Sequence, residues 1–245
     1  MSNTDTIQKT KSGAIVYDTD IINQISDAAF DAASWARAEP VEGALRSGGR
    51  GATMIVGEGS SEFVLRHYWR GGLPGKFVRD TYLWTGERQT RAFTEWYLLA
   101  KLAAKGLPVP QPAAARYCRS GPIYRADLLT VRVPAIRSLA DRIIEHPGDP
   151  PFWLGLGRGL RKFHDEGAYH ADLNAYNVQV NIADQLHLLD FDRGKILAAG
   201  VWQQKNLARL HRSLKKIKRA DKRVNFSSEN WELLLEGYFT EVKSA

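Results

Sequence analysis

Cysteine is almost absent from the 245-residue sequence, which contains Cys118 alone. A single cysteine cannot form an intramolecular disulfide, and it excludes any metal site built from several cysteines. Long apolar runs are also lacking, since no stretch approaches the roughly 20 apolar residues needed to span a bilayer. The polar start, MSNTDTIQKTKSG, has no apolar core of the kind that a secretory signal requires, so we do not expect export.

Acidic residues are fewer than basic residues in this sequence. The sequence has 34 Lys and Arg residues against 27 Asp and Glu, which gives a formal net charge of +7. This balance predicts attraction to polyanions. Nucleic acid, an anionic membrane surface and a phosphorylated substrate all satisfy it, so charge alone does not choose among these partners.

The first half of the chain is predicted to be rich in β-structure. The stretches TMIV and EFVLRHYW lie among glycines and predict antiparallel strands, and further strands are expected around Ala113–Tyr117 and Ala126–Val133. Arg91–Lys105 is the clearest helix of this half and is ended by Gly106. Apolar spacing predicts another helix from Asp20 to Trp35, with Asp20 as its N-cap.

The second half is predicted to be mainly helical. A strong helix is expected over Pro151–Glu166, although its three glycines lower the helix propensity. Short strands then flank a polar loop, in YHADLNAYNVQV and LHLLDFD, and a final helical part begins near Val201. We place the junction of the two halves near Leu128–Val133, which gives lobes of residues 1–129 and 130–245.

The strongest functional signal is HADLNAYN, residues 170–177, which matches the pattern H-x-D-x-x-x-x-N. Thirteen residues after Asn177 comes Asp190, at the end of the apolar strand LLDFD. In kinase-type phosphoryl transfer, an Asp on such a loop receives the proton of the acceptor hydroxyl. The Asn five residues later and an Asp after the next strand hold metal ions on the nucleotide phosphates. Asp172, Asn177 and Asp190 match these roles in type, order and spacing.

Two neighbouring residues allow more than one interpretation. His170 is expected to brace the loop in preference to transferring a proton, although both roles are kept among the catalytic candidates. Asp192 stands where the kinase pattern has glycine. It is either a second carboxylate near the metal ions or a solvated loop residue.

The nucleotide side requires a glycine-rich turn, a cation on a following strand and a Glu that pairs with the cation. The turn is predicted from Gly48, Gly49 and Gly51. Arg66, at the end of FVLR, stands where kinases usually have Lys, and a guanidinium can bind phosphate through two donors.

Alternatives remain for the cation and for its partner. Lys76 is the other candidate cation, in a loop. Glu95 is the favoured partner and Glu87 the alternative, while Glu95 is also explained as a solvated helix residue. With ATP and Mg²⁺ as the expected cofactors, the fold class predicted is α+β: a two-lobed protein-kinase-like fold with a β-rich N-lobe, one main helix in that lobe, and a mostly helical C-lobe.

Four stretches give the chain a more specific resemblance. They are VLRHYWRGGLPGKFVRDTYLWTG, RAFTEWYLLAKLAAKGLPVPQPAAARY, YRADLLT, and FHDEGAYHADLNAYNVQV with LLDFDRGKI. Over roughly residues 43–196 the sequence resembles the bacterial lipopolysaccharide kinases, most closely those that act on 3-deoxy-D-manno-octulosonic acid (Kdo). RHYWRGG and GLPVPQP are not general kinase features, so they carry this resemblance.

The resemblance implies ATP-dependent phosphorylation of a Kdo hydroxyl, the 4-hydroxyl, on the lipid A precursor during lipopolysaccharide core biosynthesis. It also implies a peripheral location at the cytoplasmic face of the bacterial inner membrane. By position in the HADL motif, Asp172 carries over as the catalytic residue. Arg66 falls on the arginine of the family's VLRHY, so the missing Lys does not indicate an inactive enzyme.

The residues also favour an acceptor other than a protein. Only about ten residues separate Asp190 from the helix near Val201, too few for the long activation loop that positions a peptide in protein kinases. The residue before Asp172 is Ala171, where protein kinases have an Arg. The alternatives are a kinase of a soluble small molecule, of aminoglycoside, choline or sugar type, and a non-catalytic pseudokinase or basic binding protein.

The segment Leu207–Arg223 combines an apolar stripe with many basic residues. The stripe is Leu207, Leu210, Leu214 and Ile217. Such a helix either lies on an anionic membrane surface or packs its stripe into the C-lobe core. No recognition motif accompanies the charge, so we do not expect nucleic acid as a partner. We expect a Kdo-bearing lipid A precursor and the membrane surface instead, with no obligate protein partner.

Overall fold

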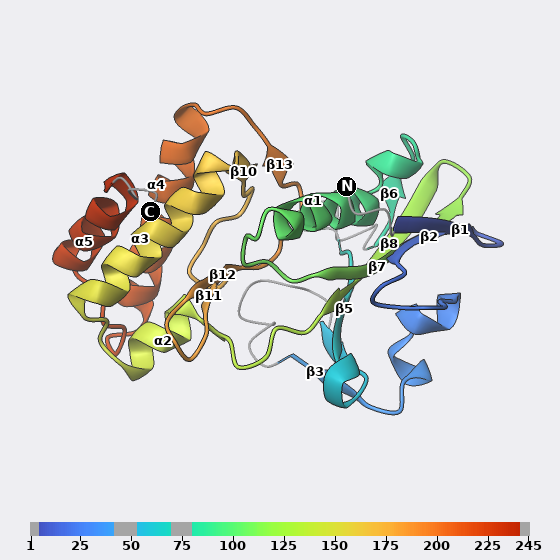
Figure 1. Ribbon diagram of the computed structural model, residues 1–245, viewed down its shortest axis with the longest axis horizontal. Coiled ribbons are helices and arrows are strands. Elements are labelled where there is room, and N and C mark those ends of the chain that lie inside the picture. Colours follow the sequence, from blue (N-terminus) through green and yellow to red (C-terminus); the bar gives the residue numbers. More distant parts are fainter. Residues whose placement is uncertain (1–4, 42–52, 70–79, 241–245) are drawn as a thin grey trace. The chain divides into compact units, whose positions relative to one another are not determined.

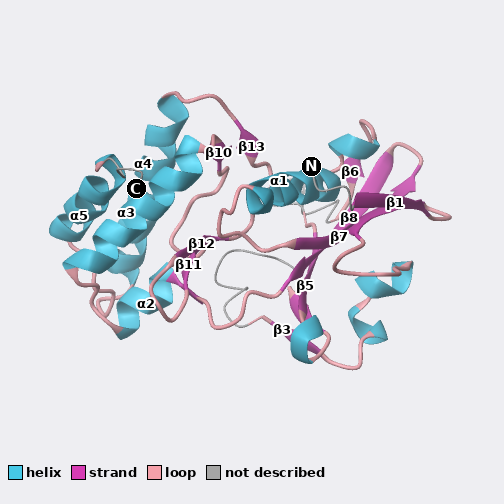
Figure 2. Cartoon of the chain, in the orientation of Figure 1, coloured by secondary structure: helices cyan, strands magenta, loops and turns pink. Residues whose placement is uncertain are grey.

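The computed structural model describes residues 5–41, 53–69 and 80–240. The chain divides into two compact units, one of Met1–Lys105 with Pro110–Arg132, the other of Gly106–Val109 with Val133–Ala245. Figure 1 traces the chain, and Figure 2 shows that the long strands belong to the first unit and most of the helices to the second. The functions predicted for the two halves stay predictions.

An antiparallel sheet forms the first unit. In its described part the strand order is β1-β2-β7-β8-β5-β4-β3, with β6 also paired to β8. The strands are β1 (Asp5–Lys9), β2 (Gly13–Asp18), β3 (Ala38–Pro40), β4 (Met54–Val56), β5 (Phe63–His67), β6 (Tyr82–Leu83), β7 (Pro112–Ser120) and β8 (Ile123–Val131). The β7–β8 hairpin turns at Gly121, whose φ of +58° favours glycine. The strands predicted in TMIV, in EFVLRHYW and around residues 113–117 and 126–133 are confirmed.

Helix α1 (Arg91–Ala104) covers one face of this sheet, over β7 and β8. Its buried residues include Phe93, Trp96 and Leu99, whose spacing of three residues puts them on one side of a helix. The chain leaves the helix through Gly106, with φ +72°. The helix predicted over Arg91–Lys105 is therefore confirmed to within one residue.

The helix predicted over Asp20–Trp35 is wrong. The segment forms two short 3₁₀ turns, η1 (Asp27–Phe30) and η2 (Ala32–Ser34). Acidic side chains compete for the main chain here: Asp18 accepts from the N–H of Asp20 and Asp31 from that of Ala33. The apolar residues are nevertheless buried, since Ile25 and Phe30 join a core cluster on the sheet.

Strands β1 and β2 were not predicted. They pair antiparallel in a continuous register from Asp5↔Asp18 to Lys9↔Ala14. Strand β1 lies at the sheet edge and is largely exposed, so its sequence lacks the alternation of apolar and polar residues that indicates a strand. A polar sequence is compatible with an edge strand, which needs main-chain pairing on one side only.

The second unit is mainly helical. Its helices are α2 (Leu139–Glu145), α3 (Pro150–Asp165), α4 (Val201–Ala220) and α5 (Ser228–Phe239), and its short strands are β9 (Arg137–Ser138), β10 (Ala168–Tyr169), β11 (Val178–Val180), β12 (Leu186–Leu188) and β13 (Lys195–Ile196). The helices predicted over 151–166 and from Val201 are confirmed. Helix α3 starts from Asp149, whose side chain accepts the N–H of Phe152.

Helix α4 buries the apolar stripe of the basic segment. Leu207, Leu210, Leu214 and Ile217 are all buried, with exposed fractions of 9% or less. This settles the packing of the stripe in favour of the core of the second unit. The described residues contain no helix long and apolar enough to cross a membrane. Together the two units form a mixed fold with an antiparallel sheet and, in the described residues, five α-helices, so the α+β class is confirmed.

Glycines allow α3 and α5 to approach at main-chain distance. A Cβ at Gly157 would lie 2.0 Å from the carbonyl oxygen of Leu234, and one at Gly237 would lie 2.1 Å from that of Leu154. The glycines of α3 are not equivalent. Gly157 is required for the close approach of α5, whereas a Cβ at Gly155 would meet only the end of the Arg158 side chain, at 4.0 Å.

We expect Gly157→Ala to lower the free energy of unfolding by about 1–3 kcal/mol, because the methyl group must displace the main chain of α5. Gly155→Ala is the matched control, and it should raise that free energy by roughly 0.5–1 kcal/mol through helix propensity alone. Urea unfolding monitored by circular dichroism measures both. Equal effects of the two substitutions would contradict the close packing of α3 on α5.

Candidate active site

The HADLNAYN loop connects β10 to β11 in the second unit and is built around Asn174. The side chain of Asn174 accepts the N–H groups of Tyr176 and Asn177, at 2.8 and 3.0 Å, and its amide donates to the carbonyl of Asp172 at 3.0 Å. A side chain that bonds main chain two residues away fixes a turn. Asn174 was not among the predicted site residues, although an Asn inside a polar loop is a known turn signal.

His170 is buried and bridges two main-chain segments. The N–H of Asp172 donates to its Nδ1 at 3.1 Å, so the ring proton lies on Nε2, which donates to the carbonyl of Leu189 at 2.9 Å. Burial lowers the pKa of His170 below its ordinary value, which keeps the ring neutral. This geometry is that of a brace. The choice between bracing and proton transfer stays a prediction.

The same bridge brings Asp190 next to Asn177. Strands β11 and β12 pair Val178 with Leu188, and the N–H of Leu189 donates to the carbonyl of Asn177 at 3.0 Å. Asp190 follows directly with φ +63°, a left-handed conformation that Asp tolerates better than most residues. The two candidate metal ligands therefore lie at the same end of a strand pair.

The donor set fits a hard cation that is held mainly by phosphates and water. Asn177 uses its Nδ2 to donate to the carbonyl of Asp172 at 2.9 Å, so its Oδ1 could serve as an oxygen ligand together with the carboxylate of Asp190. The described residues contain no group of three or more His, Cys, Asp or Glu side chains that could hold a metal ion. One amide oxygen and one carboxylate are the protein share that Mg²⁺ commonly takes at nucleotide sites.

Between the two aspartates of LLDFD, Phe191 is fully buried and packs 4.8 Å from the ring of His170, centroid to centroid. Asp192 is half-buried and so is not a fully solvated loop residue. Its role stays open.

Helix α4 borders the catalytic loop with three polar side chains on one face. Asn206 bonds both the N–H and the carbonyl of His170, at 3.2 and 2.9 Å, and the Ser213 hydroxyl accepts the N–H of Ala175. Between them, Arg209 donates from Nε and Nη2 to Oδ1 of Asp172. Asn206, Arg209 and Ser213 are spaced by three and four residues, as on one face of a helix. The sequence alone does not single them out, because the many basic residues of the segment dominate its pattern.

In the first unit, Arg66 on β5 pairs with Glu95 on α1. Its Nη2 donates to Glu95 and, at 3.0 Å, to the hydroxyl of Tyr68, which in turn donates to Glu95 at 2.7 Å. Glu95 is buried, so its interpretation as a solvated helix residue is wrong. Burial and the charge of Glu95 raise the pKa of Tyr68 well above its ordinary value.

The other candidates for the nucleotide side do not enter this group. Glu87 pairs with Lys9 and accepts the hydroxyl of Tyr117 at 2.7 Å. Gly48, Gly49, Gly51 and Lys76 lie outside the described residues. The nucleotide-binding role of Arg66 and Glu95 stays a prediction.

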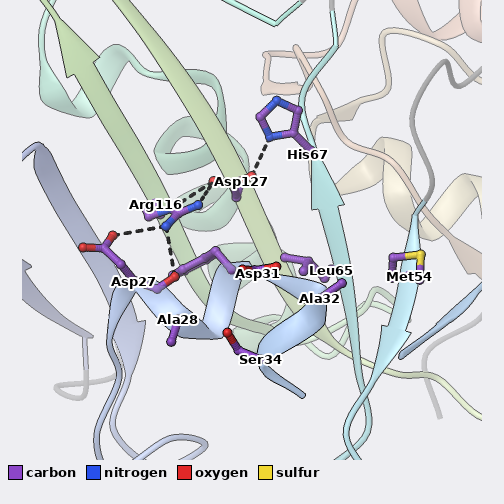
Figure 3. A pocket seen from close by; sticks show the side chains of 11 residues that line it. Asp27, Ala28, Asp31, Ala32, Ser34, Met54, Leu65, His67, Arg116 and Asp127 are labelled. Atoms are coloured by element: carbon purple, nitrogen blue, oxygen red, sulfur yellow. Dashed lines mark hydrogen bonds and ion pairs between the residues drawn. The ribbon is translucent and has the colours of Figure 1, made fainter. Parts of the chain in front are cut away.

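On the opposite face of the same sheet, a buried charge network surrounds Asp127. One carboxylate oxygen lies 2.6 Å from Nδ1 of His67, and the other accepts Nε and Nη2 of Arg116, at 3.0 and 2.8 Å. Arg116 also donates to Asp27 of η1. These residues line an open cavity of about 720 Å³ (Figure 3).

This network fixes the strand that carries Arg66. His67 pairs with Asp127 in the β5–β8 ladder, and the neighbouring pair is Arg66 with Leu128. Alternation along the strand places His67 on one face and Arg66 on the other. Asp27, His67, Arg116 and Asp127 are paired with one another, so this network is a structural support for the strand that carries Arg66.

Comparison with known proteins gives a consistent match. The sequence matches the family described as "Lipopolysaccharide kinase (Kdo/WaaP) family" over residues 35–238, a range that includes all the predicted site residues. A protein of Photobacterium profundum is 39% identical over 225 residues, which cover 91% of this chain and 94% of the relative. One of Xylella fastidiosa is 40% identical over 230 residues, covering 93% and 90%.

A third relative, from Xanthomonas campestris pv. campestris, is 43% identical over 209 residues, or 84% of this chain and 82% of the relative. Each of the three is named 3-deoxy-D-manno-octulosonic acid kinase.

We expect the stabilisation from His67 to decrease as the pH rises. Burial alone would lower its pKa, but the hydrogen bond and charge of Asp127, with Asp80, raise it above 6.5. The stabilisation is therefore fully present below pH 6.5 and lost as the pH rises through the folded-state pKa. The difference in unfolding free energy between wild type and His67→Gln, measured in urea across this range, should shrink with increasing pH. A difference that grows with pH would contradict the network.

Glu95→Gln should lower the free energy of unfolding by about 1–3 kcal/mol, because a buried carboxylate that accepts charge-assisted bonds is lost. Glu145→Gln is the control, since Glu145 pairs with Arg137 at the surface and its removal should change that energy by less than about 1 kcal/mol. Thermal and urea unfolding measure both. If the two substitutions had equal effects, the buried pair would not stabilise the unit.

Proposed function

Because the chain belongs to the lipopolysaccharide kinase (Kdo/WaaP) family, we propose that it phosphorylates a hydroxyl group of Kdo, the 4-hydroxyl, on a lipid A precursor in lipopolysaccharide core biosynthesis. The relatives named for this activity support the acceptor. The observation that carries the chemistry is the loop geometry, which places Asp172, Asn177 and Asp190 around one braced turn.

Asp172 receives the proton in this mechanism. The acceptor hydroxyl donates a hydrogen bond to the carboxylate of Asp172. The hydroxyl oxygen forms a bond to the γ-phosphorus of ATP, and the bond between that phosphorus and the leaving ADP breaks. The proton passes to Asp172 and then to water. Asn174 and His170 hold the main chain of Asp172 on both sides, so the carboxylate is oriented before the acceptor binds.

Mg²⁺, when bound to the nucleotide phosphates, neutralises the charge that develops during transfer. Asn177 and Asp190 would hold it on the protein side. Arg66, oriented by Glu95 and Tyr68, would bind the nucleotide phosphates from the first unit, with Gly48, Gly49 and Gly51 as the proposed glycine turn. A β-rich unit with one helix and a helical unit with the catalytic loop support a two-lobed protein-kinase-like fold.

We place the enzyme on the cytoplasmic face of the inner membrane as a peripheral protein. The outer face of α4 supports this location, because Arg212, Lys215, Lys216 and Arg219 are exposed there. The apolar stripe of the helix is buried, so attraction to anionic lipids would be electrostatic and would weaken with salt.

Asp172→Asn should reduce phosphoryl transfer by roughly 10²–10⁴-fold, because the amide cannot accept the hydroxyl proton. The measurement is transfer from radiolabelled ATP to defined lipid A precursors bearing one or two Kdo units. Asp165→Asn is the control, since Asp165 pairs with Arg161 on the surface of α3.

Near-normal transfer by Asp172→Asn would contradict the mechanism. Transfer to soluble sugars or aminoglycosides, with none to the glycolipid, would contradict the acceptor.

A further inference from the structure

Arg209 reaches the catalytic loop from a different part of the chain. Its position on α4 is fixed by neighbours on the same face, since Asn206 holds the main chain of His170 and Ser213 holds that of Ala175. Asn206 is buried, whereas Arg209 and Asp172 keep 47% and 41% of their side chains exposed. Arg209 is thus anchored at its base, while its guanidinium and the carboxylate of Asp172 both remain accessible to a ligand.

The bonds between the two side chains leave a specific set of atoms unused. Nε and Nη2 of Arg209 both donate to Oδ1 of Asp172. Within the described residues, Oδ2 of Asp172 accepts no hydrogen bond and Nη1 of Arg209 donates none. The ion pair therefore leaves one carboxylate oxygen that can accept a hydroxyl proton and one guanidinium nitrogen that can bind an anion.

The catalytic loop itself has no cation to offer. Residues 170–177 read HADLNAYN, with neither Lys nor Arg, and His170 is neutral and committed to main-chain bonds. Among the described residues, the cation that bonds the Asp172 carboxylate is therefore Arg209, which comes from α4. Arginine is suited to this position, because its planar fork can bind two carboxylates at once through different nitrogens.

The proposed acceptor is an acid. A 3-deoxy-octulosonic acid carries a carboxylate, which is ionised at neutral pH, on the same sugar as the hydroxyl to be phosphorylated. We infer that Arg209 is a specificity-determining residue: Nη1 binds the carboxylate of the sugar acid while Nε and Nη2 hold Asp172, so that the hydroxyl meets Oδ2. This inference rests on the proposed function and extends it to the chemical group that is recognised.

The test combines enzyme variants with two acceptors. One acceptor is the Kdo-bearing lipid A precursor, and the other is the same molecule with its Kdo carboxylate converted to the neutral methyl ester. The enzymes are the wild type, Arg209→Gln, Arg209→Lys and Lys205→Gln. Lys205 is the matched control, since it lies one turn earlier on α4, carries the same charge and is exposed. The readouts are kcat and KM for each acceptor, and KM for ATP.

We expect the wild type to prefer the acid over the ester by about tenfold or more in kcat/KM, the usual gain from a hydrogen bond to a charged group. Arg209→Gln should abolish most of this preference, chiefly by raising KM for the acid. Arg209→Lys should keep part of it, because an ammonium retains the charge without the fork. Lys205→Gln should leave the preference unchanged. The coupling between variant and acceptor isolates the contact from any general loss of activity.

Three results would overturn the inference. The first is an equal loss on both acceptors in Arg209→Gln, which would limit Arg209 to orienting Asp172. The second is a change confined to KM for ATP, which would assign it to the donor phosphates. The third is a wild type without preference for the acid. A wild type that phosphorylates neither glycolipid would instead contradict the proposed function itself, and the inference would fall with it. Melting temperatures of Arg209→Gln and Lys205→Gln within the same range as the wild type show that both variants are folded.

Discussion

The geometry of the candidate site depends on one buried, neutral imidazole. His170 accepts from the N–H of Asp172 and donates to the carbonyl of Leu189, so one ring joins the segment that carries the proposed base to the segment that carries Asp190. Both bonds require the proton to be on Nε2, and burial lowers the pKa of the ring, which favours this neutral form. A protonated imidazole would place a second N–H against the N–H of Asp172. This geometry suits a neutral histidine and agrees with the predicted bracing role, which stays a prediction.

A second buried polar group plays the corresponding part in the first unit. Asp127 is almost completely buried, and each of its oxygens accepts from a different cation, His67 on β5 and Arg116 on β7. A buried carboxylate is costly unless it is fully bonded, so only the register that brings all three together satisfies it. The same register pairs Arg66 with Leu128, and so it also determines the position of the Arg66 side chain on the sheet. In both units, then, a buried polar residue helps to position a residue that is proposed to contact a substrate.

Local patterns predicted those parts of the fold that depend on local interactions. The helix over Arg91–Ala104 and the strands of the β7–β8 hairpin follow from apolar spacing and from glycine and proline at their ends. The strand Asp5–Lys9 could not be found in this way, because an edge strand obtains its stability from main-chain pairing with Gly13–Asp18. The segment 20–35 shows the reverse error: its apolar spacing suits a helix, but Asp18 and Asp31 bond the main chain and leave only short turns. In the candidate site, motif spacing predicts roles for Asp172, Asn177 and Asp190, and these roles stay predictions. It could not identify Asn206, Arg209 or Ser213, which meet the loop only after folding.

Helix α4 explains why the basic segment was ambiguous in the sequence. Three requirements are superimposed on one helix: Leu210 and Leu214 pack inward, Asn206, Arg209 and Ser213 bond the catalytic loop, and Arg212, Lys215 and Lys216 remain outside. In the sequence, Arg209 is one basic residue among eight between Leu207 and Arg223, and composition gives no means to separate it. Arg209 differs from the other basic residues because it lies three residues after Asn206 and four before Ser213. At this spacing the three side chains lie on one face of a helix. The charge that contacts the reacting group and the charge exposed on the outer face thus belong to the same rigid element. An anionic group drawn to the outside of α4 is consequently already close to the residue that we infer to recognise the acceptor.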